Sequence, residues 1–261
     1  LDPADPSAFV TDVRCVARQT SPRLAYLMPD FQNPTGLLLD EQQRRRVAAG
    51  LHRVGTVTLI DETLVDLGLD VPAPAPFAAL ARPDRVVTVG TLSKSFWGGL
   101  RVGWLRAEAD VVQRLTAAAV RAQLSGPVLE QLAACHLLDA ADAAGALQVR
   151  RDLLRTQRDA LVSALGAALP RWQVPVPPGG LVLWCGLPEP WANGLVDAAQ
   201  QRGLRLAAGP RFGTGHAFAD RLRLPYTQPV EVLHRAVDIL ADITDTLPRT
   251  APDPSPTRLV L

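Results

Sequence analysis

Short apolar runs that end in polar, Gly or Pro residues alternate along the chain with stretches of helical periodicity. Four such runs in the first half predict strands at residues 24–28, 57–60, 85–90 and 102–105. The uninterrupted run at 24–28 predicts a buried strand. Asp40 supplies a helix N-cap, and the pattern after it predicts a helix to about residue 54. Strands that alternate with helices favour an α/β domain with a mostly parallel sheet.

The second half of the chain is more helical and ends in a smaller module. Its periodicity predicts helices at residues 109–124, 127–138, about 141–169, 191–202 and 230–247. Apolar runs predict two further strands, at residues 181–185 and 222–225. We therefore expect a large α/β domain over residues 1–143, a small α+β domain over 144–247, and a Pro-rich flexible tail over 248–261.

The composition indicates an ordinary globular protein of the cytoplasm. The formal net charge is +1 with interleaved signs, so we expect no nucleic-acid contact from this segment and no binding to an anionic membrane. No apolar run approaches the roughly 18 residues of a transmembrane helix. The widely spaced cysteines predict reduced thiols, and the histidines lack metal-ligand spacing, so we expect no metal. The N-terminus has neither a signal-peptide pattern nor Met, which suggests a start inside a longer chain.

Lysine usage changes this picture. Lys94 is the only lysine among 27 basic residues, and every other one is arginine. An ammonium group can lose its proton and attack a carbonyl, whereas a guanidinium stays protonated. The lone lysine therefore marks either a nucleophile or a solvated surface residue, and its surroundings have to decide between the two.

Polar residues follow three of the predicted strands. Asn33, Asp61 and Lys94 each lie just beyond the carboxyl end of a strand. In an open parallel sheet, ligands bind outside those ends. Each residue has a simpler interpretation, because Asn33-Pro34 is typical of a turn and Asp61 of a terminal cap. Together they predict a binding site at one edge of the sheet.

These residues belong to motifs: Asn33-Pro34-Thr35-Gly36, Asp61-Glu62-Thr63, and the run from Thr91 to Trp104 that contains Ser93-Lys94 and Gly99-Leu100-Arg101. In order and separation they resemble the class I/II aminotransferases of fold type I, over about residues 20 to 245. The interval from Lys94 to Arg101 is one residue shorter than in many class I enzymes. It is more similar to the aminoadipate/kynurenine-type enzymes and to MocR-type regulators, which carry such a domain behind a GntR-like winged helix.

The resemblance implies pyridoxal 5′-phosphate (PLP) as cofactor and a role for each matching residue. Lys94 is expected to form the internal aldimine and to move a proton during catalysis, and Asp61 to pair with the pyridinium nitrogen. Asn33 is expected to bind the phenolic oxygen, and Thr91 and Arg101 the phosphate. In the small domain, Arg223 matches the ligand of the substrate carboxylate. Arg221 competes with it, because alternation along a strand places both on one face.

Two departures from the family pattern stand out. Leu64 occupies the position where the family commonly has a tyrosine that donates to the phenolic oxygen. The residues before Asn33 contain neither the family's upstream phosphate-binding turn nor its ring-stacking aromatic residue. We therefore expect the chain to be an N-terminally truncated aminotransferase domain, with the N-terminal part of the large domain missing.

Three functions stay open. The first is a PLP-dependent aminotransferase that acts on an amino acid and a 2-oxo acid, as a homodimer. The second is the PLP-binding effector domain of a MocR-type transcriptional regulator without steady turnover, with a DNA-binding domain upstream. The third is an inactive remnant. Fold resemblance alone does not separate them, because function depends on the site.

Overall fold

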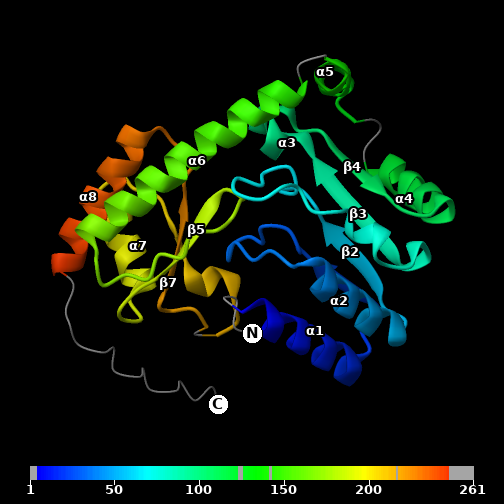
Figure 1. Cartoon of the computed structure of the whole chain (residues 1–261), viewed down its shortest axis with the longest axis horizontal. Coiled ribbons are helices and arrows are strands. Elements are labelled where there is room, and N and C mark those ends of the chain that lie inside the picture. The colour runs from blue at the N-terminus through cyan, green and yellow to red at the C-terminus, as the bar shows by residue number, and fades with distance from the viewer. Residues whose placement is uncertain (1–4, 123–125, 141–142, 216, 247–261) are drawn as a thin grey trace. The chain divides into compact units, whose positions relative to one another are not determined.

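The computed structural model describes residues 5–122, 126–140, 143–215 and 217–246, which form two compact units (Figure 1). The first unit contains the described residues up to Leu153 together with Pro177–Gly180. The second contains Leu154–Val176 and the described residues from Leu181 onward. The predicted domain boundary falls at the start of helix α6 (Ala143–Ala168), which contributes to both units. The predicted tail, 248–261, lies outside the described residues.

The first unit is built on a four-stranded sheet in the order β1-β2-β3-β4. Its strands are β1 (Leu24–Leu27), β2 (Val57–Asp61), β3 (Val86–Thr91) and β4 (Gly103–Arg106). The first three run parallel, and β4 runs antiparallel to β3. The predicted α/β architecture with a mostly parallel sheet is therefore confirmed.

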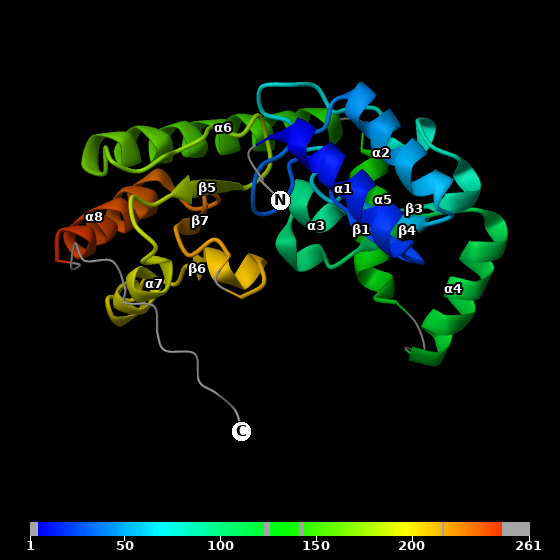
Figure 2. The ribbon, with the colours of Figure 1, turned by 90° about the horizontal axis from the view of Figure 1, so that it is seen from below.

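Helices α1 (Pro6–Thr20) and α2 (Glu41–Arg53) lie side by side along the sheet (Figures 1 and 2). Asp40 caps α2 as predicted, in a capping box in which its carboxylate accepts from Gln43 N (2.7 Å). The sequence analysis missed α1, although Asp5 caps it and Pro6 occupies its first turn. The two helices cover one face of the sheet with a core that includes Val10, Val47, Leu51 and Ile60.

The prediction that the first strand is buried was wrong. Leu24 and Tyr26 of β1 are exposed, whereas Ala25 and Leu27 pack against the α1–α2 core. The helices therefore cover only one face of β1, which is the edge strand of the described sheet. At the opposite edge of the sheet, every residue of β4 is exposed, so the described residues cover neither face of that strand.

The remaining elements of the first unit follow β3. They are α3 (Leu92–Ser95), α4 (Ala109–Ala122) and α5 (Val128–Asp139), with short 3₁₀ turns at Phe77–Ala79, Pro83–Arg85 and Gly98–Leu100. Ala134 of α5 packs with Leu92 and Leu100, which fixes the segment on either side of Lys94. None of the described helices has the length and hydrophobicity needed to cross a bilayer.

The second unit contains a three-stranded antiparallel sheet in the order β5-β7-β6. Its elements are β5 (Val182–Gly186), α7 (Ala192–Gln201), β6 (Ala207–Ala208), a 3₁₀ turn at Gly209–Phe212, β7 (Arg221–Pro225) and α8 (Val230–Thr246). All of β5 is buried, and Trp184 on it meets the rings of Phe212 and Phe218 edge-on. This unit is the predicted small α+β module.

Candidate active site

The topology brings five of the predicted site residues to one edge of the first unit's sheet. Asp61 ends β2 and Thr91 ends β3, and Asn33 follows β1 in the loop that leads to α2. Lys94 lies in α3, directly after Thr91. Because β4 runs antiparallel, with Gly103 opposite Thr91, Arg101 just before β4 reaches the same edge. Arg223 belongs to the second unit.

The short helix that carries Lys94 is held from both sides. Thr91 caps it by accepting from Ser93 N (3.1 Å), and the Thr91 hydroxyl donates to Val102 O (2.6 Å). Ser95 is buried and donates to Asp66 Oδ2 (2.9 Å). Lys94 itself is exposed. The backbone of α3 is thus fixed while the amine of Lys94 stays accessible. A phosphate bound by Thr91 would replace Val102 O as the acceptor of the Thr91 hydroxyl.

Arg101 has an unusual backbone conformation. Its φ of 52° lies in the left-handed region, which non-glycine residues adopt rarely. The Gly98–Leu100 turn precedes it, and the ring of Trp97 covers Gly99 so closely that a Cβ there would lie 2.3 Å from Trp97 Cζ2. Such a conformation persists only where the surrounding structure maintains it.

Asp61 has a hydrogen-bond donor on each carboxylate oxygen. Thr63 N donates to Oδ1 (2.9 Å), and the phenol of Tyr26 on β1 donates to Oδ2. Partial burial, this hydrogen bond and the charge of Asp61 raise the pKa of Tyr26 to about 12, so the phenol keeps its proton at neutral pH. The sequence analysis missed Tyr26, although it lies on the strand that leads to Asn33. Leu64, at the position of the family's tyrosine, is buried.

The loop around Asn33 is stabilised by its own side chains. The amide oxygen of Gln32 accepts from Thr35 N (3.0 Å) and from Thr35 Oγ1 (2.6 Å). Gly36 adopts φ +74°, and a Cβ there would lie 2.7 Å from Pro177 Cβ, so glycine is required twice over. Asn33 lies exposed on this rigid turn.

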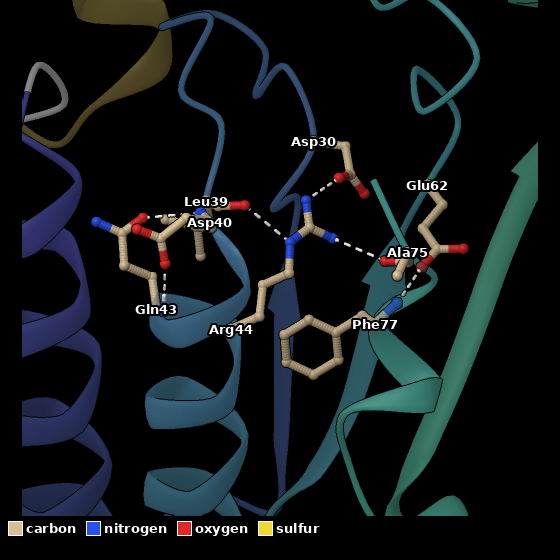
Figure 3. Close-up of polar contacts among 8 residues, drawn as sticks. All are labelled: Asp30, Leu39, Asp40, Gln43, Arg44, Glu62, Ala75 and Phe77. Atoms are coloured by element: carbon tan, nitrogen blue, oxygen red, sulfur yellow. Dashed lines mark hydrogen bonds and ion pairs between the residues drawn. The ribbon is translucent and has the colours of Figure 1, made fainter. Parts of the chain in front are cut away.

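A buried arginine ties this loop to the rest of the site (Figure 3). Arg44 on α2 is 1% exposed; its Nε donates to Leu39 O (2.8 Å), and its Nη1 lies 3.5 Å from Ala75 O. Its Nη2 forms an ion pair with Asp30, which is fully buried. Asp30 and Leu39 flank the Asn33 turn. The guanidinium of Arg44 thus links the loop that contains Asn33 to α2 and to the segment that follows Asp61.

Glu62 adds a second buried carboxyl group beside this pair. Its backbone N donates to Val89 O (2.9 Å), and its Oε1 accepts from Phe77 N (2.8 Å). Burial raises the pKa of Glu62 and also that of Asp30, and in Asp30 it outweighs the opposing effect of Arg44. Sequence alone gave no signal for Glu62 beyond its place next to Asp61.

The two candidate carboxylate ligands of the second unit have different surroundings. Arg221 forms an ion pair with the neighbouring Asp220 (3.8 Å). The guanidinium of Arg223 lies over the ring of Phe212, 6.0 Å from its centroid, and burial lowers the pKa of Arg223. Both stand on β7 as the alternation predicted, with Arg223 opposite Trp184.

Comparison with known proteins places this arrangement in a family. The profile of the family described as Aminotransferase class I and II matches residues 27–240. The chain belongs to this family. It is 30% identical to the 2-aminoadipate transaminase of Thermus thermophilus, over 81% of this chain and 54% of that protein. It is 28% identical to the uncharacterized HTH-type transcriptional regulator YisV of Bacillus subtilis, over 64% of this chain and 35% of the regulator.

A solved structure confirms the fold type I architecture. LysN, the alpha-aminoadipate aminotransferase of Thermus thermophilus in complex with N-(5′-phosphopyridoxyl)-L-leucine, matches with a TM-score of 0.85 and 27% identity. The match covers 91% of this chain and 62% of LysN. This chain spans about half the length of the curated aminotransferases that it matches.

The residues at the sheet edge fit the cofactor of this family, PLP. The exposed amine of Lys94 suits the aldehyde of PLP, and the carboxylate of Asp61, held by two donors, suits the pyridine nitrogen. The amide of Asn33 suits the phenolic oxygen. The hydroxyl of Thr91 and the guanidinium of Arg101 suit the phosphate. Among the described residues, no cluster of three or more His, Cys, Asp or Glu side chains could hold a metal ion.

Replacing Arg44 with Met should lower the free energy of unfolding by about 3–5 kcal/mol, because it leaves the buried Asp30 carboxylate uncompensated. Arg45→Met on the same helix is the matched control, since Arg45 forms only an exposed pair with Glu41. That change should cost less than about 0.5 kcal/mol. Chemical denaturation of both variants measures the difference. Equal losses would show that Arg44 is not a buried anchor.

Replacing Glu62 with Gln should make stability less dependent on pH. The pKa of Glu62 is raised in the folded state. The stability that Glu62 contributes is therefore full at pH values below its pKa in the unfolded state, about 4.3, and is lost as pH rises through its pKa in the folded state. Gln keeps an oxygen for Phe77 N and has no proton to lose. The difference in unfolding free energy between about pH 5 and about pH 8 should therefore shrink. Glu41→Gln, at an exposed site on α2, should leave that difference unchanged.

Proposed function

We propose that this chain carries the lysine side of the active site of a PLP-dependent aminotransferase, which transfers an amino group between an amino acid and a 2-oxo acid. The observation that supports the proposal is that Asn33, Asp61 and Lys94 all lie at the carboxyl ends of the parallel strands: Asp61 ends β2, and Asn33 and Lys94 follow β1 and β3. Membership in the class I and II family supports the same reaction.

Each residue then has a defined task. PLP, when bound, supplies an electron sink for the α-carbon of the substrate. Lys94 would hold the cofactor through its aldehyde carbon and would move the proton at the α-carbon of the substrate. Asp61 holds the proton of the ring nitrogen, and Asn33 donates to the phenolic oxygen. Arg101 and Thr91 bind the phosphate.

In the second unit, Arg223 is proposed to bind the α-carboxylate of the substrate. Its half-buried guanidinium, packed over Phe212, is less screened by water than an exposed one, which strengthens a bidentate contact. Arg221, which pairs with the neighbouring Asp220, is the alternative ligand.

A homodimer in the cytoplasm completes the proposal. Large apolar side chains stand exposed on α4 and α5, among them Val120, Leu129 and Leu132. Exposed apolar surface of this kind is typical of association sites. We propose that it is covered when two copies assemble.

The second candidate function is a PLP-binding effector domain of a transcriptional regulator. The similarity to the HTH-type regulator YisV favours it. Both candidates use the same cofactor site, so binding does not separate them, whereas steady turnover does. Release of a 2-oxo acid over many cycles by the full-length protein would support the enzyme, and a single half-reaction without turnover would support the regulator.

Lys94 should be the point of cofactor attachment. Borohydride reduction of the full-length protein with PLP, followed by peptide mapping, should place the label on Lys94. Lys94→Arg should abolish the absorbance band of the lysine-bound cofactor and leave the fold intact, because it keeps the charge and removes the nucleophile. A stable label on another amine, with none on Lys94, would contradict the assignment.

Replacing Arg223 with Lys should impair the use of amino acids selectively. The change keeps the charge but loses the planar fork, at a cost of about 1.5–3 kcal/mol in kcat/KM. Amines without a carboxylate should be affected much less, and PLP affinity should not change. Arg221→Lys is the matched comparison on the same strand face. If Arg221→Lys shows the selective loss instead, the carboxylate ligand is Arg221.

A further inference from the structure

Asp61 receives its two hydrogen bonds from independent parts of the first unit. Thr63 belongs to the turn that follows Asp61, whereas Tyr26 belongs to the neighbouring strand β1. Tyr26 pairs with Leu59 in the parallel register, and Leu59 and Asp61 are two residues apart on β2. Side chains two residues apart share a face of the sheet, so the register itself brings the phenol to the carboxylate.

The two donors differ in what they fix. The bond from Thr63 N closes a local turn and restrains Oδ1 only relative to the segment that carries Asp61. The bond from Tyr26 ties Oδ2 to a separate strand, so the carboxylate is held through both of its oxygens by two different parts of the unit. A phenol that ionises only near pH 12 remains a donor throughout the pH range in which an enzyme works.

The position of this phenol is informative. Tyr26 is the only tyrosine in the sequence of the first unit, because Tyr226 belongs to the second. At Leu64, where the family commonly places a phenol on the oxygen side of the cofactor ring, this chain has no donor. Tyr26, the one tyrosine of the first unit, is instead bonded to the carboxylate assigned to the ring nitrogen.

We propose that Tyr26 is a positioning residue, which holds Asp61 in the orientation that receives the pyridine nitrogen of PLP. The proposal rests on the proposed function. It assigns to Tyr26 an effect that acts through Asp61 and needs no contact between Tyr26 and substrate.

The first test uses the full-length protein without cofactor. Ultraviolet absorbance measures the formation of tyrosinate as pH rises in the wild type, Tyr26→Phe and Asp61→Asn. The ionisation step that is present in the wild type and absent in Tyr26→Phe belongs to Tyr26. Asp61→Asn should move that step to lower pH, since it removes the charge that raises the pKa of Tyr26. An unmoved step would overturn the proposal.

The second test uses the protein loaded with PLP. Tyr26→Phe should weaken PLP binding roughly tenfold, the lower end of the range for hydrogen bonds to charged groups. It should also shift the pH midpoint of the absorbance of the lysine-bound cofactor. In an Asp61→Asn background, Tyr26→Phe should add nothing, because its effect passes through that carboxylate. Leu24→Ala, an exposed site on the same strand face, is the matched control and should leave both readouts unchanged.

These outcomes separate the two proposals. Additive losses from Tyr26→Phe and Asp61→Asn, or a Tyr26→Phe protein with the affinity and spectrum of the wild type, would overturn the positioning role and leave the aminotransferase intact. A full-length wild type that binds no PLP would overturn the proposed function, whatever the tyrosinate titration shows.

Discussion

A buried guanidinium supports the geometry of the candidate site. Arg44 places a full charge where water cannot reach it, and an unpaired charge there would cost several kcal/mol. The charge is tolerated because the guanidinium pairs with Asp30 and donates to the carbonyl of Leu39, and the carbonyl of Ala75 lies near its third nitrogen. Such an arrangement adds little net stability compared with apolar packing, but it allows few alternatives. We infer that it specifies where the Asn33 turn, α2 and the segment after Asp61 lie.

The backbone path at the end of β2 likewise places two side chains at once. Strand alternation directs Thr58 and Ile60 into the interior and leaves Asp61 at the edge of the sheet. Glu62 then turns inward and binds Phe77 N, which anchors the residues that follow. Two adjacent carboxylates therefore have opposite tasks, because one faces the site and the other faces the core. The raised pKa of Glu62 and the accessibility of Asp61 are two consequences of one backbone path.

Most of the fold could be predicted from periodicity, and so could the placement of the motif residues. The predicted strands differ from the observed ones by about a residue at each end, and Asp40 caps α2 through a local contact that the sequence contains. Helix α1 has a similar cap in Asp5-Pro6, a signal that was present but not used. Arg44 stands among three consecutive arginines. Its spacing from Val47 and Leu51 places it on the apolar face, so helical periodicity could have singled it out.

Tyr26 could not be found in this way, because its role depends on the register between two strands that are distant in the sequence. A carboxylate at the ring nitrogen of PLP keeps that nitrogen protonated, so the ring can accept electrons from the substrate. In this chain, Asp61 has a donor on each oxygen, and one of them comes from a separate strand. If Asp61 pairs with that nitrogen as proposed, these two donors hold it in one orientation before the cofactor binds, which is the preorganisation that electrostatic stabilisation requires.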